Sequence, residues 1–289
     1  MQSIVTRKTQ VELIRSESTR LMEYFNALPP EALESASRCE MWNAGEVIAH
    51  LVWFEEYYGG LIERGLRGDH SPTEAFPSLP PGTPNRQVII DESVGQSAID
   101  LRRSLGQKLI PAFNERYDWL NDMLKGMGPE DWDKLCYHPT GLRSVVSFLP
   151  TLISELALHE WDIRSTLEPS PPVSQESMSV LMEKLPSNRS RPWSISFPDI
   201  KDIPGPIRYR FELTGEAGGT QDILVEGDKA RMEPAGEGSA DLTLAGDTST
   251  FILLMYGRLK LESSISSGRF KAEGDLGIIP NFDRWLEGN

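Results

Sequence analysis

The sequence predicts a multidomain protein, with an all-α four-helix bundle at residues 1–170 followed by a smaller α+β domain at residues 174–289. At 289 residues the chain is longer than a typical domain of about 100 to 150 residues. Apolar residues recur at helical spacing in the first part, whereas apolar and polar residues alternate in the second part, as in strands. The proline-rich stretch EPSPPVS at 168–174 separates the two patterns and marks the boundary.

Two helices are predicted before residue 69. The first covers about residues 7–28, where apolar side chains recur every three to four positions until a Pro-Pro pair ends the run. The second begins at Asn43, whose side chain caps the helix while Glu46 reaches back as the third residue of a capping box. Its apolar face continues to the glycines near residue 65.

Residues 69–91 contain five prolines and no sustained periodicity, which is typical of a long connection with a function, such as a lid over a site. A third helical region is predicted at about 92–126, with a bend at Pro111. The fourth helix covers about 144–168, with Pro150 in its first turns. Four long helices joined in this way favour an antiparallel bundle, and bundles build their sites from inward side chains on facing helices.

The second domain begins with a short helix at about 174–185. In the next element, IRYRFELTG, apolar residues alternate with polar ones, which predicts a strand with one buried face. Two further strands, a helix, a last strand and a terminal helix follow, at QDILVEG, ADLTLAG, residues 247–257, GRFKAEGD and the segment that ends in FDRWLEG.

The charge of the chain argues against two classes of partner. With a formal charge of −14 and a pI near 4.8, it lacks the excess of Lys and Arg that binding to nucleic acid or to an anionic membrane requires. No window reaches the roughly 18 to 20 continuous apolar residues of a membrane span, and the first residues, MQSIVTRKTQVELIR, have no signal-peptide core. We therefore expect a soluble cytoplasmic protein with small-molecule partners, and a monomer by default.

The chain has two isolated cysteines, Cys39 and Cys136. They form neither a CxxC pair nor a disulfide framework, so we expect both to be reduced. Nothing in the sequence places either thiol beside an activating base. An internal thiol nucleophile is therefore the weaker interpretation.

The stretch ELALHEWDIR places ionisable residues in an otherwise apolar helix. Glu155, His159 and Asp162 fall on one stripe, because residues three and four apart stack on the same side. A buried carboxylate costs several kcal/mol unless a cation, hydrogen-bond donors or a metal satisfies it. With His50 from the second helix, Glu155 and His159 could supply three ligands and leave an open fourth position, the arrangement of a catalytic zinc site. We expect Asp162 either to hydrogen-bond to a ligating histidine or to pair with Arg164.

Other interpretations stay open on spacing alone. A lone histidine on an apolar helix face is more often a hydrogen-bonded core residue than a ligand. Glu46, four residues before His50, forms a rival pair, although its capping role in a partly solvated first turn favours Glu155 as the ligand. His70 and His138 lie in predicted loops near prolines, where we expect them to face solvent.

Two longer segments carry more specific motifs, SRCEMWNAGEVIAHLVW and PEDWDKLCYHPTGLRSVVSFLPTLISELALHEWDIRSTL. They contain a W-x7-HL element and an E-x3-H-x2-D element, at Trp42, His50 and Leu51 and at Glu155, His159 and Asp162. Over about residues 8–168 the chain closely resembles the N-terminal domain of the mycothiol-dependent maleylpyruvate isomerase family, a branch of the DinB-like metal-binding four-helix bundles. The C-terminal half looks like the family's sterol-carrier-like second domain, most clearly at ADLTLAGDTSTFILLMYGRL.

The resemblance implies that His50, Glu155 and His159 ligate a divalent metal, usually zinc, although the donor set also suits iron(II), nickel or cobalt. It implies a low-molecular-weight thiol cofactor, which is mycothiol in the best-known members; ergothioneine, bacillithiol or glutathione could enter the same open position. The implied activity is cis-trans isomerisation of maleylpyruvate-type 2-oxo diacids, or S-transfer to electrophiles as in related enzymes. The metal would stabilise the thiolate and so supply a nucleophile at neutral pH.

The resemblance also suggests that an arginine of the C-terminal domain approaches the interdomain cleft and binds a dicarboxylate substrate. Arg258 in MYGRL and Arg269 in SGRFK are the candidate catalytic residues, and a solvated surface arginine is the alternative for either. Two other functions stay open. One is a non-catalytic protein that binds a lipid or small ligand and has a structural metal, and the other is a thiol-independent metal hydrolase whose open position holds water.

Overall fold

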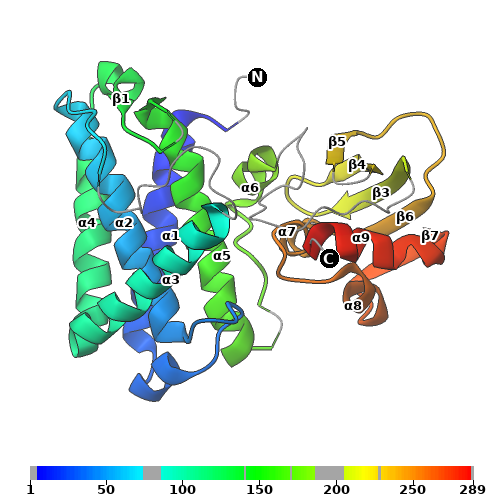
Figure 1. The fold of residues 1–289 in the computed structure, drawn as a ribbon, viewed down its shortest axis with the longest axis horizontal. Coiled ribbons are helices and arrows are strands. Elements are labelled where there is room, and N and C mark those ends of the chain that lie inside the picture. Colours follow the sequence, from blue (N-terminus) through cyan, green and yellow to red (C-terminus); the bar gives the residue numbers. More distant parts are fainter. Residues whose placement is uncertain are drawn as a thin grey trace. The chain divides into compact units, whose positions relative to one another are not determined.

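The computed structural model describes residues 5–73, 86–139, 141–169, 171–185, 205–226 and 229–287. The chain divides into two compact units, Met1–Val173 and Ser174–Asn289. Among the described residues, the first unit is helical apart from a two-stranded hairpin, and the second combines helices with a five-stranded sheet. The predicted class, an all-α domain followed by an α+β domain, is confirmed (Figure 1).

The first unit is built from long helices that run alongside one another. They are α1 (Arg7–Ala27), α2 (Ala44–Leu66), α3 (Arg86–Leu105), α4 (Leu109–Gly126) and α5 (Leu149–Leu167). The connections contain the 3-10 helices η1 (Pro30–Glu34), η2 (Gly106–Lys108), η3 (Pro129–Asp133) and η4 (Val145–Phe148), and the paired strands β1 (Leu135–Cys136) and β2 (Arg143–Ser144). Because α1 packs against α4 and α5, and α2 against α4 and α5, these four helices enclose the bundle core (Figure 1).

Local sequence signals account for the bundle's packing and for the start of α2. Leu21, Phe25 and Phe113 are buried on the apolar stripes of α1 and α4, and the rings of Phe25 and Phe113 meet edge to face at 5.0 Å. The predicted capping box is present. Asn43 Oδ1 accepts a hydrogen bond from the Glu46 N–H at 2.9 Å, and the Glu46 carboxylate accepts one from the Asn43 N–H at 2.8 Å.

The predicted third helical region is two helices rather than one bent helix. A 3-10 turn separates α3 from α4 and contains Gly106 at φ 52°. Glycine adopts this left-handed conformation without the steric penalty of a Cβ atom, so the chain breaks here. The predicted bend at Pro111 is therefore wrong, and Pro111 lies in the first turn of α4, where a missing N–H costs little. Of the predicted lid at 69–91, residues 74–85 lie outside the described residues, and its last part already belongs to α3.

The second unit contains α6 (Met178–Lys184) and a sheet with the strand order β5-β4-β3-β6-β7. Its strands are β3 (Ile207–Thr214), β4 (Gly219–Glu226), β5 (Lys229–Pro234), β6 (Leu242–Asp247) and β7 (Phe270–Gly274), and its further helices are α7 (Thr248–Met255), α8 (Leu261–Ser266), η5 (Leu276–Ile278) and α9 (Ile279–Glu287). β3 pairs antiparallel with β4 and parallel with β6, with Tyr209 opposite Ile223 and Leu242. The pairs β4–β5 and β6–β7 are antiparallel. The sequence patterns missed β5, because KARMEP contains only one large apolar residue.

The core of the second unit lies on one face of this sheet. Burial alternates along β3 as predicted, and Tyr209 and Phe211 point into the core. Phe211 meets Phe251 of α7 at 4.8 Å between ring centroids, and Tyr209 meets Phe282 of α9 at 4.9 Å. Aromatic side chains from the sheet and from two helices therefore fill the space between them.

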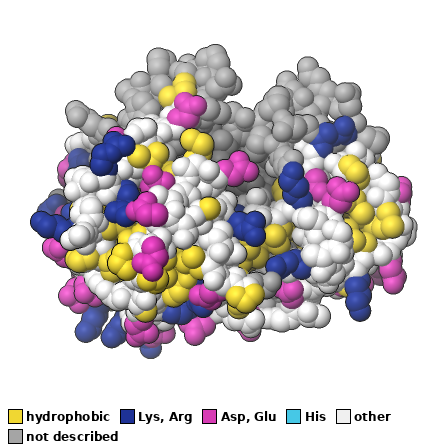
Figure 2. All heavy atoms as spheres, turned by 90° about the horizontal axis from the view of Figure 1, so that it is seen from below, with side chains coloured by type: hydrophobic (Ala, Val, Ile, Leu, Met, Phe, Trp, Pro, Cys, Tyr) yellow, Lys and Arg dark blue, Asp and Glu magenta, His cyan; other side chains and the backbone are white. Residues whose placement is uncertain are grey.

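The surface is strongly charged with both signs. Figure 2 shows one face of the molecule, on which acidic and basic side chains are interspersed. Within the described segments, no helix has the length and the apolar character that crossing a membrane requires.

Candidate metal centre

Two helices of the bundle bring the predicted ligands together. His50 lies in the second turn of α2, and Glu155 and His159 lie one turn apart on α5. Glu155 Oε2 is 3.1 Å from His50 Nε2 and 3.2 Å from His159 Nε2. The ligand atoms of the three residues lie within 4.8 Å of one another. One carboxylate oxygen is thus shared between two imidazole nitrogens from facing helices.

The cluster is largely removed from solvent. The side chains of His50 and His159 are 8% and 10% exposed, whereas that of Glu155 is 24% exposed. The indole ring of Trp42 covers one side, with its centroid 4.8 Å from that of His50, and Phe54 lies one turn along α2 at 5.9 Å from the same ring. Solvent therefore reaches the cluster on the side of Glu155.

The electrostatics of the three groups are coupled. Burial lowers the pKa of His50. Burial opposes the charge on Glu155 as well, but hydrogen bonds from His159 and His50 outweigh it and hold the pKa of this carboxyl well below its usual range. Burial disfavours the protonated form of His159 and so lowers its pKa. Its hydrogen bonds with Asp162, Cys39 and Glu155 outweigh burial and raise the pKa of His159 well above the ordinary value. The two shifts have opposite directions and both favour an ion pair between His159 and Glu155.

These residues fit a divalent metal. Two imidazole nitrogens and a carboxylate oxygen are the donors of catalytic zinc sites with three protein ligands, and they also suit iron(II), nickel and cobalt. A cation at this point would replace the proton on His159 and satisfy the buried carboxylate, so its binding would release a proton. The donor set of His50, Glu155 and His159 thus has the chemistry and the convergence that a metal needs.

The surroundings of His159 decide between the two roles that the sequence left open for Asp162. His159 Nδ1 donates to Asp162 Oδ2 at 2.9 Å, whereas Arg164 pairs with Glu160 and with Glu168, at 2.9 and 2.8 Å. Asp162 therefore orients His159 rather than pairing with Arg164. His50 differs, because its Nδ1 atom is buried and has no hydrogen-bond partner in the described part of the chain.

Cys39 is the neighbour that the sequence did not predict. Its Sγ atom lies 3.3 Å from Asp162 Oδ2 and 3.8 Å from His159 Nδ1, so a carboxylate and an imidazole flank this thiol. The two cysteines are free, as expected, and Cys136 is buried, which raises the pKa of its thiol to about 11. No sequence signal could have found the contact with Cys39, because 123 residues separate it from Asp162.

The other candidate side chains lie elsewhere. Glu46 is engaged in the capping box of α2 and is not part of the cluster. His70 is exposed after α2, as predicted. The expectation that His138 faces solvent is wrong, because the β1–β2 hairpin places its half-buried ring 6.3 Å from Tyr58 and 6.0 Å from Phe148. Burial, and then Arg143, lower the pKa of His138.

The two candidate arginines belong to the second unit. Arg258 follows α7 and is half-buried, and its Nη1 donates to the backbone oxygen of Tyr256 at 2.9 Å. Arg269 precedes β7 and is also half-buried. It lines a hollow of about 580 Å³ at one end of the sheet, together with Asp247 and Lys271.

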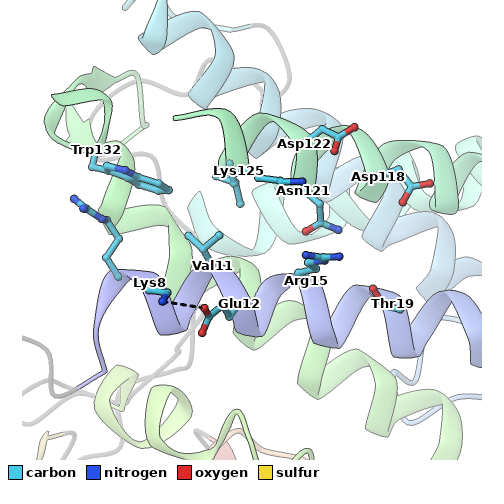
Figure 3. Close-up of a pocket in the computed structure, with 12 residues that line it drawn as sticks. Lys8, Val11, Glu12, Arg15, Thr19, Asp118, Asn121, Asp122, Lys125 and Trp132 are labelled. Carbon is cyan, nitrogen blue, oxygen red and sulfur yellow. Dashed lines mark ion pairs between the residues drawn. The ribbon is translucent and has the colours of Figure 1, made fainter. Parts of the chain in front are cut away.

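A larger groove lies on the outside of the bundle, between α1 and α4. It has a volume of about 800 Å³, and Figure 3 shows Arg15 on α1 opposite Asn121 on α4, with Trp132 at one end. Its lining mixes both signs of charge and contains no histidine or cysteine. The groove therefore lacks the imidazole and thiol groups that the cluster in the bundle core contains.

Two protein-family models match the chain. The model described as the mycothiol maleylpyruvate isomerase N-terminal domain matches residues 14–164, and the model described as the SCP-2 sterol transfer family matches residues 201–287. A curated relative, hydroxysteroid dehydrogenase-like protein 2 of Xenopus laevis, is 30% identical over 81 residues, a segment that is 27% of this chain and only 19% of that protein.

Two solved structures share the fold over nearly the whole chain. The crystal structure of the mycothiol-dependent maleylpyruvate isomerase matches with a TM-score of 0.61 at 12% identity, covering 96% of this chain and 98% of that chain. A mutant of that isomerase matches with a TM-score of 0.61 at 11% identity, over the same shares of both chains. At this level of identity the likeness shows a common fold, and function has to be argued from the site.

Proposed function

We propose that this chain, which belongs to the family of the mycothiol maleylpyruvate isomerase N-terminal domain, is a thiol-dependent isomerase of maleylpyruvate-type 2-oxo diacids. The single observation that carries this proposal is the convergence of His50 and His159 on one oxygen of Glu155 inside the bundle. A buried donor set of this kind is suited to a divalent metal with an open position for a small ligand. Mycothiol is our first expectation for the thiol and zinc for the metal.

The residues of the cluster would hold the metal through His50 Nε2, Glu155 Oε2 and His159 Nε2. When bound, such a metal would lower the pKa of a coordinated thiol below its free value of about 8.5. One carboxylate and two neutral imidazoles leave about one positive charge at the site, which favours an anionic sulfur. Asp162 holds the His159 ring in the orientation that points Nε2 towards Glu155.

The proposed reaction conserves all atoms and electrons. The thiolate sulfur adds to one carbon of the cis double bond, and the displaced electron pair moves onto the conjugated oxo group as an enolate. The former double bond is now single and rotates. The enolate electron pair then re-forms the double bond in the trans geometry and expels the thiolate. A dicarboxylate substrate also needs fixed cations, and we propose Arg258 or Arg269 for this role.

The packing of the second unit favours an enzyme over a lipid carrier. Tyr209, Phe211, Phe251 and Phe282 are 0% exposed and occupy the space between the sheet and the helices that cover it. An apolar ligand there would have to displace these rings. Two free cysteines and a small-molecule thiol are in keeping with the reducing cytoplasm, which is where we place the protein.

A thiol panel on protein of known metal content tests the proposal. Maleylpyruvate and a generic electrophile are each assayed with mycothiol, ergothioneine, bacillithiol, glutathione or no thiol, with and without chelator. We expect chelator-sensitive isomerisation of maleylpyruvate with one thiol. S-alkylation of the electrophile without isomerisation would assign an S-transferase instead. Hydrolysis without any thiol would contradict the proposal, and so would lipid binding by metal-loaded protein that turns over neither substrate with any thiol.

A further inference from the structure

We infer that Cys39 is a positioning residue of the metal centre, because its thiol and the imidazole of His159 bind the same oxygen of Asp162. The Sγ–H of Cys39 donates to Asp162 Oδ2 at 3.3 Å, and Nδ1–H of His159 donates to the same atom at 2.9 Å. The inference rests on the proposed function in one respect, which is that His50, Glu155 and His159 hold a metal. It assigns a role to a residue outside the donor set.

The acceptor of both hydrogen bonds is fixed from several directions. Asp162 is 0% exposed, so bulk water cannot replace a lost donor. It lies three residues after His159 on α5, which brings its carboxylate against the Nδ1 side of the ring. A second donor on Oδ2 restricts the rotation of the carboxylate about its χ angles and, through it, the orientation of His159.

The 37–42 turn that carries Cys39 is itself tightly held. The hydroxyl of Ser37 accepts from the Cys39 N–H at 3.0 Å and donates to the Trp42 carbonyl at 2.7 Å, and the Trp42 N–H donates to the Cys39 carbonyl at 2.8 Å. The backbone N–H of Arg38 donates to the Asp162 carbonyl at 2.9 Å. Both the side chain and the backbone of Asp162 therefore dock this turn.

The same turn also reaches the second histidine. The ring of Trp42 lies 4.8 Å from the ring of His50 and 6.3 Å from that of His159, so one turn contacts both imidazoles. His50 Nδ1 has no hydrogen-bond partner among the described residues, whereas His159 Nδ1 is held by Asp162, which Cys39 also contacts.

Cobalt(II) binding tests this role without relying on turnover. Its affinity is measured by competition with a chromophoric chelator for the wild type, Cys39→Ala and Cys39→Ser, with Cys136→Ala as the matched cysteine control. Cys136 packs against Gly65, which lies 15 residues beyond His50 on α2 and so about 22 Å away. Substitutions of residues that orient metal ligands weaken metal binding by about 10- to 100-fold. Because a thiol is a weak hydrogen-bond donor, we expect the effect of losing Cys39 at the lower end of this range.

We therefore expect Cys39→Ala to weaken cobalt binding by about 10-fold and to change the d–d absorption bands. Cys39→Ser keeps an O–H donor and should restore most of the affinity and the wild-type bands, while Cys136→Ala should match the wild type. Affinity and bands of Cys39→Ala equal to those of the wild type would overturn the inference alone. A thiolate-to-cobalt charge-transfer band that disappears in both Cys39 variants would overturn it by making Cys39 a ligand. Wild-type protein that binds no stoichiometric cobalt would overturn the metal centre together with the inference.

Discussion

Glu55 on α2 is a buried acid that lies outside the proposed donor set of His50, Glu155 and His159. Its side chain is 0% exposed, and both carboxylate oxygens have no hydrogen-bond partner in the described residues. Burial raises the pKa of Glu55 to about 8, and the nearby Arg116 opposes this shift only in part. Glu55 is therefore protonated in the folded protein at neutral pH, whereas in the unfolded chain it ionises near pH 4.5.

This difference makes the stability of the protein depend on pH. Between about pH 4.5 and 8 the folded state retains a proton that the unfolded state has lost, so the free energy of unfolding falls as the pH rises. The loss reaches roughly 5 kcal/mol above pH 8, at about 1.4 kcal/mol for each unit by which the two pKa values differ. Glu55→Gln, which is neutral and of similar shape, should remove this dependence. Urea unfolding at pH 5, 7 and 9 checks this, with Glu56→Gln as control. If the free energy of unfolding of Glu55→Gln fell with pH as steeply as that of the wild type, the prediction would be contradicted.

His50 and Glu46 lie four residues apart on α2 and should respond differently to substitution. We expect His50→Ala to abolish stoichiometric metal uptake, because the cluster loses one of its two imidazoles. Glu46→Gln should keep the metal and lose about 1 kcal/mol of stability or less, because only the capping box is weakened. Metal analysis and chemical denaturation of the two variants give both quantities. Loss of metal in Glu46→Gln together with its retention in Glu155→Gln would reverse the choice of ligand.

At the scale of helices, a buried ion-pair network joins α1 to α5. The guanidinium of Arg20 contacts the carboxylates of Glu17 and Glu160, with an Nε to Oε1 distance of 3.1 Å to the latter. Glu17 and Glu160 have side chains only 0% and 6% exposed. Arg164, which also lies on α5, pairs with Glu160 and so joins the network. The network matters for stability because Glu17 and Glu160 are buried in the helix interface, where a carboxylate without a cationic partner is costly.

Removing the shared arginine should therefore be costly. Arg20→Met leaves Glu17 and Glu160 without this cation, and we expect a loss of about 3 kcal/mol, at the low end for a broken buried pair because Arg20 itself is 35% exposed. Arg103→Met is the control, because the Arg103–Asp100 pair is exposed and should change stability by less than about 1 kcal/mol. Equal effects of the two substitutions in urea unfolding would show that the network does not stabilise the α1–α5 interface.

The molecule as a whole carries a formal charge of −14, which disfavours a doubly charged anionic substrate at long range. Fixed cations are therefore needed close to the reacting carbon. We propose Arg258 and Arg269 for this role; both are half-buried, so less of their binding energy would be lost to water than at a fully exposed site.

If one of these arginines binds a substrate carboxylate, its substitution should affect binding more than metal content. We expect Arg258→Ala or Arg269→Ala to raise KM for the dicarboxylate by about 10-fold or more, as for the loss of a charge-assisted hydrogen bond. Arg231→Ala is the control, because Arg231 is exposed and pairs with Glu233 on β5. Steady-state kinetics with metal analysis decide this, and unchanged KM in both variants would exclude the two arginines from substrate binding.

The sequence by itself determined the features that depend on local periodicity. Helical spacing located the bundle helices, the alternation in IRYRFELT predicted β3, and the Asn43/Glu46 spacing predicted the start of α2. It also placed Glu155, His159 and Asp162 on one side of α5, because residues three and four apart share a helix face. Local backbone geometry and side-chain direction suffice for such predictions.

Only the tertiary structure decided which distant groups meet. Residue types and the family resemblance pointed to His50 beside Glu155, 105 residues away, but left Glu46 as a rival; the contact of Cys39 with Asp162, 123 residues away, was not predicted. The break at Gly106 was also missed, since many helical glycines cause no break and a positive φ is visible only in the folded backbone. The physical reason why the Cys39 contact was missed is tertiary packing. Contacts between separate elements depend on how helices pack and where turns dock, and a one-dimensional pattern does not encode the distance between two side chains.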